Sequence, residues 1–266
     1  MLVPFQRKYL PFDDASSSAA IREWFNSEAG LTVVRSAVAK VESLLPNLFG
    51  YHLAIFADYI DRDLISSSRI SHQIILSSEY EKDADRTLVT EHTALPLVEN
   101  SIDVLILPHT LEFADDPHQL LREAERVLIG EGHILIISFN PWSLYGLWKA
   151  LLGWRGGVPW RGKFISQNRI KDWLQLLGFD IESATKVGFR PPIKRPGINR
   201  RLEFLDQLGA FCWPLFGNVS ILLAKKRVAS ITPLKASWET RRRLLGGGSV
   251  AEPTTRNHQN AERHEL

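Results

Sequence analysis

Residues 95–140 read LPLVENSIDVLILPHTLEFADDPHQLLREAERVLIGEGHILIISFN. An apolar run, Ile102 to Leu107, leads into a short acidic loop. A segment with apolar residues at helical spacing follows, and a turn with two glycines at 130–132 precedes a second apolar run, Ile134 to Phe139. The order strand, loop, helix, turn, strand predicts one βαβ unit, in which a covering helix joins two parallel strands.

This stretch resembles the second half of class I S-adenosylmethionine-dependent methyltransferases. The resemblance is strongest here and extends more loosely over Tyr51 to Lys226. It implies an α/β fold: a Rossmann-like, mostly parallel seven-stranded sheet with helices on both faces and an antiparallel seventh strand beside the sixth. It also implies methyl transfer from S-adenosylmethionine to an acceptor that the sequence does not identify. The matching elements, in order, are Leu95-Pro96-Leu97, Ser101-Ile102-Asp103-Val104, His109-Thr110-Leu111-Glu112, Asp116-Pro117, Leu121-Arg122-Glu123, Arg126-Val127-Leu128 and Gly130-Glu131-Gly132.

The composition is typical of a globular protein with one sizeable core. Of the 266 residues, 44% are hydrophobic and 23% are charged, and the formal net charge is +2. The only cysteine, Cys212, excludes an intrachain disulfide and a cysteine metal cage, and no His/Asp/Glu cluster has metal-ligand spacing. Since the start lacks a signal-peptide pattern and no apolar run reaches the roughly 18 residues of a membrane span, we expect a cytoplasmic protein.

The pattern along the chain divides it into three parts. Residues 1–50 predict an N-terminal helical extension packed on the core. One of its helices carries Ile21, Trp24 and Phe25, and a second runs from about 31 to 45. Residues 51–227 predict the methyltransferase-like α/β domain, and residues 228–266 predict a basic, disordered tail. Within the domain we expect strands at 53–57, 73–76, 87–91, 102–107, 134–139, 179–187 and 218–224, and helices at 144–152, 165–177 and 201–213.

The turn after the first predicted strand departs from the family pattern. Family members usually carry a glycine-rich turn there, which lets the backbone approach the cofactor closely. Here Ala57 takes the place of the first glycine and Asp58 follows it. Side chains at these positions crowd the methionine end of the cofactor, and cost roughly 1 kcal/mol or more wherever positive φ is needed. Two interpretations stay open: a reshaped pocket that binds the cofactor through Ala57 and Asp58, or a lost pocket on a retained scaffold.

The resemblance implies further cofactor contacts. An acidic side chain at the end of the second strand would accept hydrogen bonds from the ribose hydroxyls. That place falls near Ser77 or Ser78, so Glu79 is the candidate, unless it is an ordinary surface glutamate. Glu91 aligns with the residue that faces the adenine amino group, and His92 aligns with a neighbouring backbone contact. A solvated glutamate at a strand end is the alternative for Glu91.

Two residues follow the fourth and fifth strands, at the edge of the sheet where ligands bind in open α/β folds. His109 is a candidate for cofactor or substrate contact and a weak candidate for a catalytic base, the alternative being a packing residue. Asn140 is a candidate for orienting a polar group of the substrate, although an Asn-Pro turn explains it more simply.

Aromatic and basic residues suggest further surfaces. Trp142, Trp148, Trp154 and Trp160 fit either a substrate lid or docking face, or packing beneath a long loop, and we favour packing. Basic residues gather at 190–201 and 225–243. They predict either solvated charge, which is the simpler interpretation, or weak contact with nucleic acid or an acidic partner.

Three functions are therefore compatible with the sequence. The first is a methyltransferase that uses S-adenosylmethionine. The second is a catalytically inactive protein of the same fold that binds or scaffolds a partner. The third is a nucleic-acid-associated protein that uses the basic segments.

Overall fold

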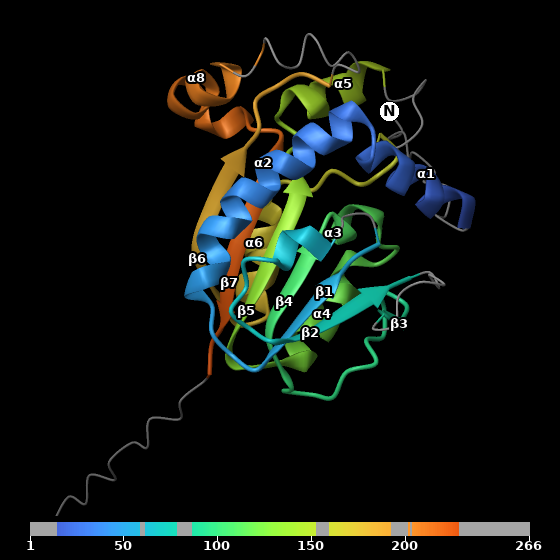
Figure 1. The fold of residues 1–266 in the computed structure, drawn as a ribbon, viewed down its shortest axis with the longest axis vertical. Coiled ribbons are helices and arrows are strands. Elements are labelled where there is room, and N and C mark those ends of the chain that lie inside the picture. Colours follow the sequence, from blue (N-terminus) through green and yellow to red (C-terminus); the bar gives the residue numbers. More distant parts are fainter. Residues whose placement is uncertain are drawn as a thin grey trace, which may run out of the picture. The chain divides into compact units, whose positions relative to one another are not determined.

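The computed structural model describes residues 15–58, 62–78, 87–152, 160–192, 202 and 204–228, which all fall in one compact unit. Its seven-stranded sheet has the order β3-β2-β1-β4-β5-β7-β6 (Figure 1). All neighbouring strands from β3 to β5 pair in parallel, whereas β7 is antiparallel to both β5 and β6. The predicted seven-stranded α/β sheet is thus confirmed. The strands are β1 His52–Phe56, β2 His72–Ser77, β3 Thr87–Val89, β4 Ile102–Pro108, β5 Leu128–Phe139, β6 Phe179–Val187 and β7 Val219–Lys226.

Helices cover both faces of the sheet (Figure 1). The long helix α2 (Glu28–Leu44) follows α1 (Ala15–Phe25) and packs on one face, and α4 (Pro117–Val127) and α6 (Gln167–Leu176) pack on the other. Within the described residues, the remaining helices are α3 Thr110–Phe113, α5 Leu144–Leu152 and α8 Phe204–Cys212, with short 3-10 turns η1 Leu45–Asn47, η2 Arg62–Ile65 and η3 Pro214–Phe216.

Two apolar cores explain why the central strands are continuously apolar. On β4, Val104 and Ile106 face the core beneath α1 and α2, while Leu105 and Leu107 face the core beneath α4 and α6. A strand that is buried on both faces needs apolar residues at every position instead of an alternating pattern. Each such side chain stabilises the fold by about 1.5–3 kcal/mol when it is fully buried.

The helix α4 connects several of the sequence elements that match the family, through its cap and its contacts with the turn at 95–97. Asp116 caps it, because its Oδ1 accepts hydrogen bonds from the amides of His118 and Gln119 at 2.9 and 3.1 Å. Near the other end, the Arg126 guanidinium donates to the carbonyls of residues 95 and 97, at 3.0 Å each, and pairs with Glu123 at 2.8 Å. Glu123 in turn accepts from the amide of Leu95. The helix therefore clamps the turn that precedes β4.

The structure corrects two expectations in this region. The turn predicted at 130–132 lies inside β5, which begins at Leu128. The register between β4 and β5 shifts there, since Ile102 faces Leu128 but Val104 faces His133, and Glu131 adopts a positive φ of 67°. The third strand also ends two residues earlier than expected, at Val89.

Candidate functional site

The strands β1, β2, β4 and β5 end at the same edge of the sheet, where ligands bind in open α/β folds. The chain leaves this edge through Asp58 after β1, Ser78 after β2, His109 after β4 and Asn140 after β5. The helix α1 approaches the same edge through contacts with Asp58 and His109. The candidate site is built from these residues.

Asp58 connects the ends of three strands. Its side chain is only 3% exposed, and its Oδ1 accepts hydrogen bonds from Ser77 Oγ at 3.0 Å and from the Ser78 amide at 2.5 Å. Its Oδ2 lies 3.1 Å from Nε2 of His92, beyond β3. A carboxylate thus reaches the end of β2, where the resemblance implies an acidic group, but it comes from β1.

The turn at Ala57 and Asp58 avoids the strain expected of a glycine-free path. Among the described residues, the positive-φ residues other than glycine are Asn100, His109 and Glu131, so neither Ala57 nor Asp58 adopts a left-handed backbone. The Ala57 amide donates to the Leu76 carbonyl at 2.8 Å, which extends the pairing of β1 and β2 by one residue.

Of the other residues predicted to bind the cofactor, only His92 makes a hydrogen bond with Asp58 among those that the structure describes. The ring of His92 stacks on Phe56 with centroids 4.8 Å apart and covers the Asp58 carboxylate. Glu91 is exposed, and its Oε2 accepts from Thr93 Oγ1 at 3.5 Å. Glu79 lies outside the described residues. The structure therefore brings Ala57, Asp58 and His92 together, with Glu91 beside them in the chain.

His109 forms a buried pair with Glu112 one helical turn later. His109 Nδ1 lies 3.2 Å from Glu112 Oε1, which also accepts from the Phe139 amide at 2.5 Å. Both side chains are almost fully buried, and among the described residues His109 Nε2 and Glu112 Oε2 have no hydrogen-bond partner. His109 itself adopts a positive φ of 55°, which is uncommon for a residue other than glycine. Sequence reasoning missed Glu112 as the partner, although the i, i+3 spacing was a usable signal.

The end of α1 covers this pair. The ring of Phe25 lies 5.1 Å from that of His109, and Arg22 Nε donates to the Asp58 carbonyl at 3.3 Å. Behind it, Tyr145 donates to the Ala29 carbonyl at 3.4 Å, and burial raises the pKa of the Tyr145 hydroxyl, which keeps it protonated. The spacing of Trp24 and Phe25 predicts that they pack on the core. Their position at the carboxyl edge depends on how α1 packs in the folded protein.

These groups suit the polar parts of S-adenosylmethionine. A carboxylate such as Asp58 is the acceptor that ribose hydroxyls require, and its geometry at the end of β2 fits that use. The unpartnered buried atoms of His109 and Glu112 fit a nearby polar ligand, since buried polar groups are normally hydrogen-bonded. In the described ranges, no group of three or more His, Cys, Asp or Glu side chains lies close enough to hold a metal ion.

Other sequence candidates have structural explanations. Asn140 Nδ2 donates to the carbonyls of Leu215 and Gly217 at 2.8 and 2.9 Å, so its side chain fixes the loop before β7. Asp103, which matches the family pattern, accepts from the amides of Tyr51 and His52 and fixes the start of β1.

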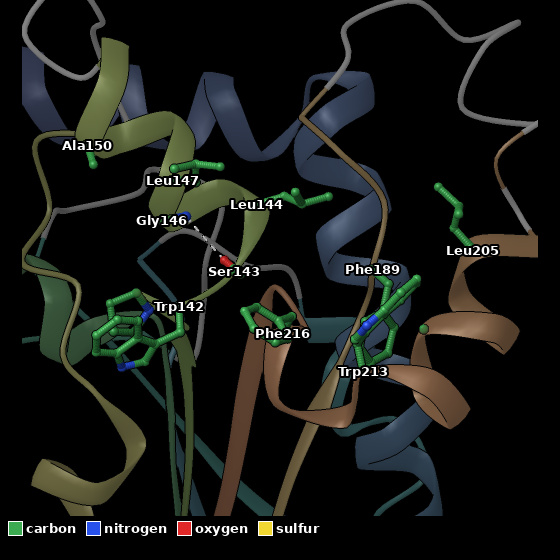
Figure 2. Close-up of a pocket in the computed structure, with 12 residues that line it drawn as sticks. Trp142, Ser143, Leu144, Gly146, Leu147, Ala150, Phe189, Leu205, Trp213 and Phe216 are labelled. Atoms are coloured by element: carbon green, nitrogen blue, oxygen red, sulfur yellow. Dashed lines mark hydrogen bonds between the residues drawn. The ribbon is translucent and has the colours of Figure 1, made fainter.

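The packing predicted for the tryptophans is wrong for two of them. Trp142 is 71% exposed and Trp148 is 45% exposed, whereas Trp160 packs against the core as expected. Trp154 lies outside the described residues. Trp142 lines a pocket of about 660 Å³ between α5 and α8, together with residues such as Leu147, Trp213 and Phe216 (Figure 2).

Within the two basic segments 190–201 and 225–243, the basic residues that the structure describes, 190 and 225–227, are in ion pairs. Arg190 contacts Asp206 at 2.7 Å, and the three consecutive basic residues at 225–227 contact Glu131, Glu125 and Asp180, respectively. Basic residues at 194, 195, 200 and 201 and from 229 onward lie outside the described ranges. In the part of the chain that the structure describes, no helix has both the length and the apolarity needed to cross a membrane.

Comparisons with known proteins agree with this architecture. A family model described as "Methyltransferase domain" matches residues 50–136. The chain is 31% identical over 194 residues to the uncharacterized protein YafS of Escherichia coli K12, covering 71% of this chain and 75% of that one.

Solved structures are similar in fold. A SAM-dependent methyltransferase from Thermotoga maritima, described as a possible histamine N-methyltransferase, aligns with a TM-score of 0.56 at 17% identity, over 79% of this chain and 96% of that chain. One from Archaeoglobus fulgidus aligns with a TM-score of 0.52 at 18% identity, over 80% and 100% of the two chains.

Proposed function

Because this chain belongs to the class I S-adenosylmethionine-dependent methyltransferase family, we propose that it transfers a methyl group to an acceptor held at the carboxyl edge of its sheet, beneath α1. The position of the Asp58 carboxylate carries this proposal. It lies at the end of β2, within hydrogen-bonding distance of Ser77 and Ser78, where an acceptor for the ribose hydroxyls is needed. The reshaped turn after β1 would thus replace the usual acidic residue of β2.

We assign His92 the role of covering this carboxylate. Its ring is held by stacking on Phe56 and by contact with Asp58 Oδ2. A carboxylate has about four lone-pair sites, and three contacts are made here, so one further donor can be accepted without breaking any of them. Rotation of the His92 side chain would free a second site on Oδ2 for the paired hydroxyls of a ribose.

We propose that His109, oriented by Glu112, accepts a proton from the methyl acceptor. When Glu112 is ionised, its Oε1 holds a proton on His109 Nδ1, which leaves Nε2 as an acceptor. The amide of Phe139 fixes the same Glu112 oxygen. This arrangement, a base oriented by a buried carboxylate, is suited to taking a proton from an attacking nitrogen or oxygen. When bound, S-adenosylmethionine supplies an electrophilic methyl group, whose transfer depends mainly on proximity and orientation.

The burial of His109 means that a substrate needs a route to its Nε2. His109 is fully buried beneath Phe25 and beside Phe139. Phe25 lies at the end of α1 and against His109, so movement of that end would open a route to Nε2, and its return would exclude water from the site. We therefore propose that α1 is the lid of the acceptor site.

The second candidate function is a binding protein of this fold without turnover. One feature of Asp58 favours the binding protein. Its carboxylate already accepts from three donors and occupies space that the cofactor needs. The two functions differ in whether S-adenosylmethionine binds at all.

Titration calorimetry of the full chain with S-adenosylmethionine separates them. We expect saturable binding of one equivalent. Asp58→Asn should weaken it about 10- to 100-fold, since a hydrogen bond to a charged group contributes about 1.5–3 kcal/mol. The control Glu42→Gln changes an exposed carboxylate on α2 and should leave affinity unchanged. No heat at millimolar ligand would overturn the transferase proposal. Unchanged affinity of Asp58→Asn would remove Asp58 from the site, and with it the observation that carries the proposal.

A further inference from the structure

Two helices beyond the carboxyl edge expose their apolar faces. On α5, Leu144, Leu147 and Leu151 recur at i, i+3 and i+7, and all three are exposed, with Trp148 beside them. The opposite side of α5 holds the buried Tyr145. A surface helix of a globular protein normally buries its apolar stripe, so the exposure of Leu144, Leu147 and Trp148 is unusual.

The helix α8 has the same property. Phe204, Leu208 and Phe211 recur at i, i+4 and i+7 and are exposed, Phe211 to 89%. The chain continues through Trp213 and the 3-10 turn η3 with further exposed apolar side chains, Leu215 and Phe216. We call the exposed apolar side chains of 142–151 and 204–216 the α5–α8 surface.

The two halves of the α5–α8 surface meet at a pocket. Figure 2 shows side chains of α5, among them Leu144 and Leu147, on one side, and Leu205 and Trp213 on the other, with Phe216 between them. Most of the large apolar side chains that are exposed within the described residues belong to these two segments. Contiguous apolar patches of this kind usually mark an interaction site.

The charge of the bordering segments indicates what covers this surface. Residues 144–163 contain four basic residues, at 149, 155, 161 and 163, and no acidic residue. Residues 186–201 contain six, at 186, 190, 194, 195, 200 and 201, of which Arg190 pairs with Asp206 and the last four lie outside the described residues. The segment 202–216 adds two acidic residues, Glu203 and Asp206, and no basic one, so 186–216 carries a formal net charge of +4 (6 basic minus 2 acidic). Leu, Trp and Phe on one face with Lys and Arg at the border are typical of helices that lie in the interface of an anionic membrane.

We propose that the α5–α8 surface docks this protein on the surface of an anionic lipid bilayer. Its apolar side chains enter the boundary between headgroups and acyl chains, and the basic borders contact the anionic headgroups. Since α5 follows the end of β5 by only a few residues, docking brings the carboxyl edge of the sheet close to the bilayer. The proposal is independent of methyl transfer, because it depends on exposed residues outside the candidate site.

Flotation of the full chain with phosphatidylcholine vesicles, with and without phosphatidylglycerol, tests the proposal. We expect binding to the anionic vesicles, weaker binding to the neutral ones, and a loss with added salt. The double substitution Leu151→Asp with Phe211→Asp should weaken binding at least about 10-fold, because two buried apolar contacts are lost and negative charge is added. The control is Leu176→Asp, which places the same charge on an exposed leucine of α6, outside the α5–α8 surface.

Three outcomes would overturn the proposal. Wild type that fails to float with anionic vesicles excludes the bilayer as partner. Binding that survives the double substitution assigns it to another basic segment, such as the arginines at 241–243. Dimerisation of the wild type in sedimentation equilibrium, abolished by the same substitutions and without vesicle binding, would make a second copy the occupant. Circular dichroism of each variant checks that the fold is retained.

Discussion

The substitution of Asp58 by alanine should destabilise the fold by about 2–4 kcal/mol. The carboxylate accepts from Ser77 Oγ and from the Ser78 amide, and alanine leaves both donors without an acceptor. A buried donor left unsatisfied costs about 1–3 kcal/mol, and the partly exposed Ser78 recovers some of this by binding water. Asparagine keeps an oxygen at the Oδ1 position, so Asp58→Asn should cost only about 1 kcal/mol.

Urea unfolding followed by tryptophan fluorescence measures both values. The control is Glu91→Ala, which removes an exposed carboxylate nearby and should change the free energy of unfolding by less than about 0.5 kcal/mol. If Asp58→Ala also stays within about 0.5 kcal/mol of wild type, Asp58 does not connect β1 to β2 as described. Equal losses for alanine and asparagine would show that the charge, and not the Oδ1 acceptor, holds the strands together.

Four further predictions concern single side chains. The hydrogen bond from its arginine partner lowers the pKa of Glu123, so its contribution is present above the ordinary value of 4.5 and is lost as pH falls through the lower folded pKa; Glu123→Gln should therefore cost about 1 kcal/mol at neutral pH, with the difference from wild type vanishing in acid urea titrations. Glu112→Ala should lower the free energy of unfolding by about 2–5 kcal/mol and Glu112→Gln by much less, because only alanine leaves the Phe139 amide without an acceptor. Equal losses would contradict this. Phe25→Ala should speed modification of His109 by diethyl pyrocarbonate, and an unchanged rate would remove α1 as the lid. If Glu91 holds the adenine, Glu91→Ala should weaken cofactor binding by about 1–3 kcal/mol in calorimetry, and unchanged affinity would exclude it.

Much of the fold was predictable because its signals are local. The apolar runs of β4 and β7, the cap at Asp116 and the cap at Ser166 each depend on residues within a few positions of one another. The shift in β5 was not predictable, since Gly130 and Gly132 fit a turn as well as an irregular strand. The exposure of Trp142 was not predictable either, because an apolar segment has the same sequence pattern whether it packs on the core or on another surface.

The candidate site was predictable only in part. The position of Asp58 after β1 followed from the resemblance, but its reach to Ser77 and His92 spans 19 and 34 residues and depends on the order of the strands. His109 lies at the carboxyl edge as predicted, whereas the way its Glu112 partner is held depends on the Phe139 amide of β5, which the local spacing does not contain. The cover by Phe25 depends on how α1 packs, which no local pattern contains.

A crystal structure of the full chain with bound S-adenosylhomocysteine would test whether Asp58 holds the ribose of the cofactor. We expect the ribose hydroxyls within hydrogen-bonding distance of Asp58, with His92 rotated away from Oδ2. Ligand bound at another edge of the sheet, or an intact contact between Asp58 and His92 in a crystal soaked at saturating ligand, would contradict it.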